Sequence, residues 1–221
     1  MIVLHHVHQT RSMRVLWLLN ELGVDFTVIG HPFDRTLRDP EYLVLSPAGR
    51  VPALEIDGER MFESLAIMQY LCEKFPSRLG GDPRALDRAE WLSWLNFSET
   101  ISQHTAALTQ QHVMLYEDSM RSPIVMRLEA ARIGKCYAAI EARLSTPIEN
   151  RETLLTSGFS AADIAVGQAV YMAQFFARLD DYPETAKWYA RLAERPAFRA
   201  SLPPEGAALF ERDFFPAWED G

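Results

Sequence analysis

The pattern of apolar residues changes near residue 80, and this change constrains the fold more than any other feature of the chain. Before it, short β-rich runs alternate with helical patterns, whereas no strand pattern is found after residue 85. The segment between the two halves is rich in proline and glycine. We therefore predict an α/β domain at residues 1–76, a linker at residues 77–84 and an all-α domain at residues 85–221.

The first half shows both kinds of periodicity. Val15, Leu18 and Leu22 recur at helical spacing, and Gly23 follows them where a left-handed residue ends a helix. The pair Asp57-Gly58 separates two β-rich runs and favours a tight hairpin. The predicted strands are residues 2–7, 26–29, 53–56 and 60–62, and the predicted helices begin near residue 15 and at residue 64, the second spanning 64–74.

The second half contains only helical patterns. Its longest uncharged apolar stretch, residues 164–177, is shorter than the ~20 residues that span a bilayer and is typical of a buried core helix. The predicted helices are residues 85–116, 122–144, 160–179, 183–194 and 205–210. An aromatic tail at residues 210–218 is expected to pack against these helices rather than to form a lid.

Composition narrows the function classes. The chain has 22 basic and 30 acidic side chains, a net charge of −8, which disfavours nucleic acid or an anionic membrane as a partner. Two distant cysteines, Cys72 and Cys136, cannot form a disulfide framework. The amino terminus lacks the basic start and long apolar run of a signal peptide, so we expect a cytoplasmic protein.

Three segments of the first half carry polar groups at positions suited to ligands. In the turn after the first strand, Thr10 or Ser12 is expected to cap the following helix, and a hydroxyl beside a helix start can also hold an anion. Val51-Pro52 opens a strand, and a cis bond there would expose the Val51 backbone to a peptide-like ligand. Ser64 is expected to cap the next helix.

These segments, in this order, resemble the glutathione transferase superfamily. Residues 10–22 read T-R-S-M-R-V-L-W-L-L-N-E-L and resemble the S-R-S-x-R-V-L-W-L-L-x-E-L of bacterial and fungal members. Residues 46–54 resemble the family pattern N-P-x-G-x-V-P-x-L, and Glu63-Ser64 resembles its acidic or amide residue followed by serine. Residues 160–165 resemble the family's buried capping box S-x-A-D-I, which we assign to folding.

The resemblance implies a thioredoxin-like N-terminal domain, an all-α C-terminal domain and glutathione as co-substrate, without a metal. By position, Val51 would pair with the cysteinyl backbone of glutathione through a cis Pro52. Glu63 would hold the γ-glutamyl ammonium and Ser64 the neighbouring carboxylate, while Arg50 would lie near the glycyl carboxylate.

The resemblance also implies a hydroxyl that activates the glutathione thiol. That hydroxyl falls on Thr10, where the family more often has serine or tyrosine, with Ser12 as the alternative and Arg11 as a possible helper. A hydrophobic electrophile would bind between the domains, and the floor of its site would comprise His104, Leu108, His112 and Tyr116.

The expected activity is transfer of glutathione to electrophilic small molecules, a detoxification reaction. Two alternatives stay open: glutathione-dependent reduction of disulfides or peroxides, and a non-catalytic glutathione-binding or interaction protein. The resemblance further implies a two-fold homodimer whose interface lies around Met68 and Trp91. His6 and His8 share a strand face, but no ligand-spaced carboxylate or cysteine is adjacent, so we do not predict a metal site.

Overall fold

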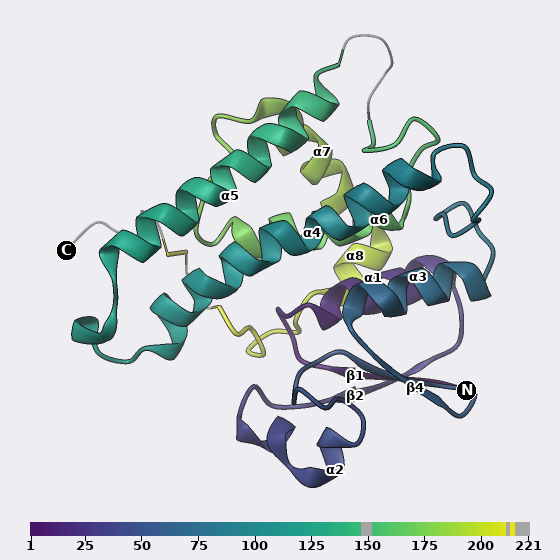
Figure 1. The fold of residues 1–221 in the computed structure, drawn as a ribbon, viewed down its shortest axis with the longest axis horizontal. Coiled ribbons are helices and arrows are strands. Elements are labelled where there is room, and N and C mark those ends of the chain that lie inside the picture. Colours follow the sequence, from purple (N-terminus) through teal and green to yellow (C-terminus); the bar gives the residue numbers. More distant parts are fainter. Residues whose placement is uncertain (147–151, 211–212, 215–221) are drawn as a thin grey trace.

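A four-stranded mixed sheet forms the base of the N-terminal half (Figure 1). The structure, a computed structural model, describes residues 1–146, 152–210 and 213–214. The strand order is β2-β1-β3-β4, with β1 parallel to β2 and antiparallel to β3. The strands are β1 (Ile2–His6), β2 (Thr27–Gly30), β3 (Ala53–Ile56) and β4 (Glu59–Phe62).

The β3–β4 hairpin turns where the sequence predicts it. Asp57 has φ 50° and Gly58 has φ 88°, so both central residues are left-handed, as this tight turn requires. Helix α3 (Ser64–Lys74) follows β4 directly and matches the predicted range.

Helices α1 (Ser12–Leu22) and α3 lie between the sheet and the C-terminal helices (Figure 1). Gly23 ends α1 with φ 63°, and its N–H donates to the Asn20 carbonyl, which confirms the predicted stop. Two short helical turns, η1 (Arg35–Arg38) and α2 (Pro40–Leu43), connect β2 to the loop before β3.

In the described residues after α3, five helices and two single turns follow. The helices are α4 (Arg88–Thr109), α5 (Pro123–Leu144), α6 (Ala161–Ala173), α7 (Pro183–Ala193) and α8 (Pro196–Ser201). The turns between α4 and α5 are η2 (Gln110–Met114) and η3 (Asp118–Met120). The described chain therefore has the predicted architecture, an α/β half followed by a helical half.

Helix α6 joins the two halves into one core. Almost all of its residues are buried, and it packs against both α4 and α1. A Cβ on Gly167 would lie 2.6 Å from Leu192 Cδ1 and 3.3 Å from the Trp17 ring, so a larger residue would require these side chains to shift. The position of α1, and hence of the turn before it, is thus fixed by the helical half.

The predicted capping box is present at the start of α6. Ser160 Oγ accepts a bond from the Ala162 N–H, and Asp163 Oδ2 accepts one from the Ser160 N–H at 3.0 Å. Asp163 Oδ1 also accepts bonds from the Leu154 N–H and from Trp188 Nε1. This fully buried carboxylate therefore ties α6 to α7 and to the preceding loop.

Three predicted helices differ from the structure: two end earlier than predicted, and a third does not form. The helix predicted over 85–116 begins at Arg88, stops at Thr109 and passes into η2; after η2 the Arg121 guanidinium holds the Leu115 carbonyl. The helix predicted to reach residue 179 stops at Ala173, and the Phe175 carbonyl instead accepts the Phe214 N–H.

No helix forms at residues 205–210, where one is predicted. Gly206 has φ 76°, which a right-handed helix does not allow. The last described helix, α8, lies earlier and begins at Pro196, a residue suited to a first helical turn.

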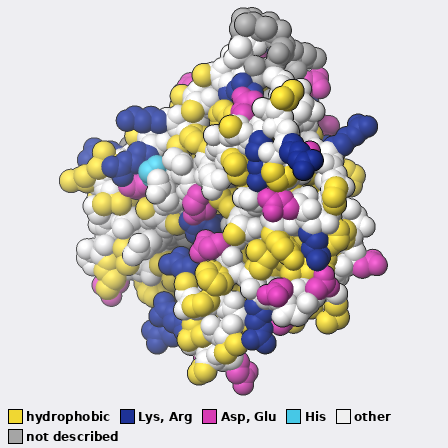
Figure 2. All heavy atoms as spheres, turned by 45° about the vertical axis from the view of Figure 1, so that its right-hand side comes forward, with side chains coloured by type: hydrophobic (Ala, Val, Ile, Leu, Met, Phe, Trp, Pro, Cys, Tyr) yellow, Lys and Arg dark blue, Asp and Glu magenta, His cyan; other side chains and the backbone are white. Residues whose placement is uncertain are grey.

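The surface is chemically mixed. Figure 2 shows acidic and basic side chains interspersed with apolar ones over the face that it presents. Within the described part of the chain, no helix combines the length and hydropathy needed to cross a membrane.

Candidate glutathione site

A cavity of about 230 Å³ opens where the α/β half meets α4. Three segments of the α/β half contribute to it: the β1–α1 turn, the loop before β3 and the β4–α3 corner. The lining residues are Arg11, Ser46, Ala48, Arg50, Val51, Pro52, Phe62, Glu63, Ser64 and Glu99. The structure thus brings together six of the eight residues predicted for thiol activation and glutathione binding; Thr10 and Ser12 are not among the lining residues.

The loop before β3 presents the backbone of Val51. The Val51–Pro52 peptide bond is cis. Among the described residues, no backbone hydrogen bond outside the helices and strands uses the N–H or carbonyl of Val51. These two groups are therefore available to pair with the backbone of an extended ligand.

The same loop is held rigidly behind Val51. The Tyr42 hydroxyl donates to the Arg50 carbonyl at 3.0 Å, and Ser46 Oγ accepts the Arg50 N–H at 3.3 Å. Gly49 has φ 60°, and a Cβ there would lie 2.7 Å from the Leu37 carbonyl oxygen. Glycine is therefore required for this close approach, and the exposed Arg50 side chain is left to face solvent beside the cavity.

Glu63 and Ser64 form the corner between β4 and α3. Glu63 has φ 69°, a strained conformation for a non-glycine residue that often marks a functional position. Ser64 is the first residue of α3 and is 4% exposed, so its N–H is one of the unpaired donors at the positive helix end. The prediction that Ser64 caps α3 is wrong: Glu63 occupies the cap position.

The charges around the cavity suit a ligand with carboxylates and an ammonium. No ion pair between described residues includes Arg50 or Glu63, so both charges are available. The N-terminus of α3 and Arg50 favour anions, whereas Glu63 favours a cation. A tripeptide with two carboxylates and one ammonium matches this arrangement.

A buried guanidinium lies directly behind this corner. Arg14 on α1 is fully buried, and its Nη1 lies 3.3 Å from Glu99 Oε2 on α4 and 3.5 Å from Ser64 Oγ. Its other nitrogens donate to Gln168 Oε1 at 3.0 Å and to Ser102 Oγ at 2.6 Å. Burial lowers the pKa of Arg14 to about 10, and it stays charged at neutral pH.

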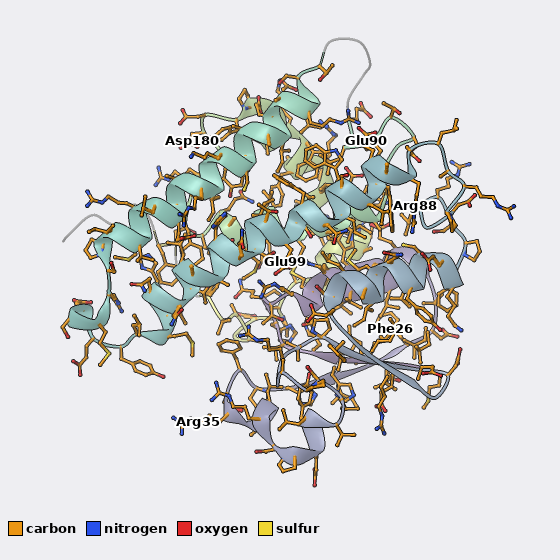
Figure 3. All side chains as sticks on the ribbon, viewed as in Figure 1. Phe26, Arg35, Arg88, Glu90, Glu99 and Asp180 are labelled. Atoms are coloured by element: carbon orange, nitrogen blue, oxygen red, sulfur yellow. The ribbon has the colours of Figure 1, made fainter. Side chains whose placement is uncertain are left out.

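Glu99 connects the helical half to the cavity. Figure 3 shows it where α4 meets the α/β half, and its second oxygen, Oε1, pairs with Arg11 Nη2 at 2.5 Å. We did not predict Glu99 or Arg14 as site residues. The sequence does contain a signal for a buried polar partner at this place. Ser98, Ser102 and Thr105 place hydroxyls on the buried face of α4, and buried hydroxyls need hydrogen-bond partners.

The β1–α1 turn holds the three residues predicted for catalysis. Thr10 is half-buried, Arg11 is partly exposed and lines the cavity, and Ser12 has no exposed surface. Arg11, rather than Thr10 or Ser12, occupies the cap position of α1, although Thr10 Oγ1 accepts the N–H of Ser12, the first residue of the helix, at 3.3 Å. Ser12 Oγ lies within hydrogen-bond distance of Val7, Thr10 and His6, so it has no access to a ligand.

The four residues predicted to form the electrophile floor lie in different surroundings. His104 contacts Glu129 on α5 at 2.6 Å, and Leu108 is buried in the core. His112 packs against Phe176 and Phe214, whereas Tyr116 is 86% exposed in the loop after η2. The helical chain continues from α4 directly into η2, and the common floor stays a prediction.

The predicted centre of the dimer interface is also wrong. Met68 and Trp91 are 0% and 3% exposed in the single chain, and Trp91 Nε1 donates to the Leu79 carbonyl. Both side chains belong to the core of one subunit and cannot form a surface patch.

The described part of the aromatic tail packs on the helical half, as predicted. The Phe210 ring packs against Phe175 and Phe176, and the Phe214 N–H donates to the Phe175 carbonyl. The Phe210 N–H also donates to Gln9 Oε1 in the β1–α1 turn. Residues 211–212 and 215–218 lie outside the described residues.

The remaining thiols and imidazoles do not form a metal site in the described chain. Cys72 and Cys136 are both buried free thiols, and burial raises the pKa of Cys72 to about 12. His6 Nε2 and His8 Nδ1 contact each other at 3.2 Å. Among the residues that the structure describes, no group of three or more histidine, cysteine or acidic side chains has metal-binding geometry.

Comparison with known proteins identifies the class to which this fold and site belong. The family models for the N-terminal and C-terminal domains of glutathione S-transferase match residues 4–80 and 123–196. Glutathione S-transferase 3 of Zea mays is 30% identical over 206 residues, covering 86% of this chain and 87% of that protein. The chain belongs to the glutathione S-transferase family, which confirms the thioredoxin-like and all-α domain pair.

Two further similarities extend over most of the chain. Glutathione S-transferase 3 of Schizosaccharomyces pombe is 28% identical, covering 90% of this chain and 86% of its own. The glutathione transferase URE2P6 of Phanerochaete chrysosporium, solved in complex with oxidised glutathione, is 27% identical with a TM-score of 0.79. That similarity covers 90% of this chain and 94% of the fungal chain.

Proposed function

We propose that this protein binds glutathione in the cavity beside cis Pro52 and activates its thiol for attack on electrophilic small molecules. The observation that carries the proposal is the convergence of the free Val51 backbone, the unpaired Glu63 carboxylate and the N-terminus of α3 on one cavity. Each group matches one part of the tripeptide: its central backbone, its ammonium and its γ-glutamyl carboxylate. Arg50 is left for the glycyl carboxylate.

Thr10 is proposed as the group that stabilises the thiolate. A free thiol has a pKa near 8.5, so half ionisation at pH 7 requires about 2–3 kcal/mol in favour of the charged form. A hydrogen bond from a hydroxyl to the thiolate supplies about 1.5–3 kcal/mol, and the N-terminus of α1 adds about 0.3–1 kcal/mol. These two contributions are sufficient without a metal or a general base.

Ser12 and Arg11 are proposed to have different roles. Ser12 is buried behind Thr10, so its proposed part is support of Thr10 rather than contact with sulfur. Arg11 reaches the cavity and is proposed to add positive charge near the ligand, although Glu99 shares that charge.

The experiment that tests the function measures binding and turnover together. Titration calorimetry with glutathione should give a saturable isotherm, and a chloronitrobenzene should be conjugated at a rate that depends on glutathione. Absence of heat at millimolar glutathione would overturn the proposal and favour an interaction protein that kept the fold.

Glutathione-dependent reduction of disulfides or peroxides remains the second candidate. Thr10 in place of the more common serine or tyrosine is the feature that keeps it open, and turnover of hydroxyethyl disulfide distinguishes it. Faster reduction of that disulfide than conjugation of the chloronitrobenzene would assign the protein to this second reaction.

We also propose a cytoplasmic homodimer acting in detoxification, with the domain division at residues 77–84. Because Met68 and Trp91 are internal, a dimer has to use the exposed parts of α3 and α4 rather than these side chains. Light scattering at micromolar protein concentration tests the assembly.

A further inference from the structure

An unbroken row of polar side chains runs from Thr10 into the sheet. Thr10 Oγ1 lies 2.9 Å from Ser12 Oγ, and Ser12 Oγ lies 2.7 Å from His6 Nδ1. His6 Nε2 in turn lies 3.2 Å from Nδ1 of His8, which is partly exposed. The row therefore connects the proposed thiol-activating hydroxyl to the protein surface through two buried residues.

The burial of His6 determines how the hydrogen bonds of this row can be directed. His6 is 1% exposed, and burial, with a smaller contribution from His8, lowers its pKa to about 4. The ring is thus neutral at physiological pH and carries one donor and one acceptor nitrogen. Which nitrogen carries the hydrogen decides the direction of every bond along the row.

In the first arrangement His6 carries its hydrogen on Nδ1 and donates to Ser12 Oγ. Ser12 Oγ already accepts the Val7 N–H at 3.1 Å, so both of its lone pairs are used and it cannot accept from Thr10. Its own hydrogen goes to Thr10 Oγ1 at 2.9 Å or to the Val7 carbonyl at 3.0 Å. Thr10 Oγ1 also accepts the Ser12 N–H at 3.3 Å, so it too has only its hydrogen left to give. That hydrogen is free for a thiolate, and without a ligand it goes to the Val7 carbonyl at 2.8 Å.

In the second arrangement His6 carries its hydrogen on Nε2. His6 Nδ1 then accepts from Ser12, and Ser12 Oγ accepts the Val7 N–H together with the Thr10 hydroxyl. Ser12 Oγ then competes with a ligand for the Thr10 hydrogen, which it cannot do in the first arrangement. The two tautomers of one buried imidazole thus differ in whether Ser12 competes for the Thr10 hydrogen.

We propose that His6 is a positioning residue. Its tautomer with the hydrogen on Nδ1, in which Nε2 accepts a hydrogen bond from His8, directs the Thr10 hydroxyl at the glutathione sulfur through Ser12. The inference rests on the proposed role of Thr10. All bonds then run in one direction, and each polarises the next, so the last donor in the row is strengthened. This gives the buried Ser12 a role without contact to the ligand.

The chain offers a closely matched set of variants. His6→Leu removes the bond to Ser12, whereas His6→Asn keeps an N–H donor near the position of Nδ1. His5→Leu is the control, because His5 is the neighbouring residue of β1 and is 5% exposed. Its ring contacts His31 and Glu55 rather than Ser12 or Thr10.

The experiment measures the pKa of the bound thiol by ultraviolet titration and the Kd of glutathione by calorimetry. We expect His6→Leu to raise the thiol pKa by about one unit, a tenfold loss of thiolate below that pKa, with a Kd within twofold of the unsubstituted protein. His6→Asn should restore most of the shift and His5→Leu should cause none. A merely structural His6 would change stability without this selective rescue.

The outcomes separate this inference from the proposed function. If the unsubstituted protein does not bind glutathione, the proposed function fails. If Thr10→Val raises the thiol pKa and His6→Leu does not, the function stands and the inference is overturned. Should His6→Leu fail to fold, long-range nitrogen-15 NMR of the unsubstituted protein with glutathione bound still decides: hydrogen on Nδ1 of His6 supports the inference, and hydrogen on Nε2 overturns it.

Discussion

Arg14 and Glu99 form an ion pair at 3.3 Å across the junction of the two halves, one from α1 and the other from α4. Arg14 has no exposed side-chain surface, whereas the Glu99 side chain is 43% exposed and also holds Arg11. The pair therefore couples the packing of the halves to the cavity, because Ser64 lies beside the same guanidinium.

Removal of the Glu99 charge should destabilise the protein. Glu99→Gln leaves the buried Arg14 with neutral partners only, and we expect a loss of about 2 kcal/mol in the free energy of unfolding, less than for a fully buried pair because the Glu99 side chain is 43% exposed. Arg11→Gln is the control, because its more exposed pair with Glu99 should contribute at most about 1 kcal/mol. Urea unfolding measures both, and equal losses would show that burial of Arg14 does not set the energy.

Loss of the Thr10 hydroxyl should weaken thiol ionisation more than binding. Thr10→Val keeps the shape of the side chain and removes its donor, so the pKa of bound glutathione should rise by at least one unit, with about a tenfold loss of thiolate below that pKa. Ultraviolet titration of the complex gives the value. Thr100→Val, an exposed position on α4, is the control, and an unchanged pKa in Thr10→Val would transfer the role to Arg11.

The Glu63 carboxylate should recognise the ammonium of the γ-glutamyl group. Glu63→Gln should raise the Kd of glutathione about tenfold, which corresponds to loss of one charge-assisted bond of about 1.4 kcal/mol. A glutathione analogue without the α-amino group should bind both forms alike. Glu59→Gln, exposed at the other end of β4, should leave the affinity unchanged, and a weaker binding of the analogue to the variant would contradict the assignment.

Features that depend on residues close together in the chain are predictable from the sequence, whereas contacts between distant segments are not. The hairpin turn, Gly23 and the capping box depend on residues near one another in the chain, so their patterns predicted them correctly. Arg14 and Glu99 meet only after α4 packs on α1, and no spacing in the sequence encodes that contact. The end of α4 was missed for another reason: residues 85–116 contain no glycine or proline, so no local signal marks the stop.

Burial of His6 predicts a pH dependence of stability. Its pKa is about 4 in the folded protein and near 6.5 when exposed, so the unfolded state binds the extra proton between these values. The contribution of His6 to the free energy of unfolding is therefore fully present above pH 6.5. It falls by about 3 kcal/mol as the pH drops toward 4. His6→Asn should flatten that part of a plot of unfolding free energy against pH; an unchanged slope would assign it to other groups.

Asp163 should contribute more to stability than any exposed carboxylate of the helical half. Its two oxygens accept bonds from the N–H groups of Leu154 and Ser160 and from Trp188 Nε1, all in the buried interior. Asp163→Asn replaces one acceptor by a donor that faces other donors, so we expect a loss of about 2–4 kcal/mol. Asp180→Asn, on an exposed turn, should change the unfolding free energy by less than about 0.5 kcal/mol. Similar midpoints for the two variants in chemical unfolding would show that the capping box is not a major contributor, and the coupling of α6 to α7 would then depend on apolar packing alone.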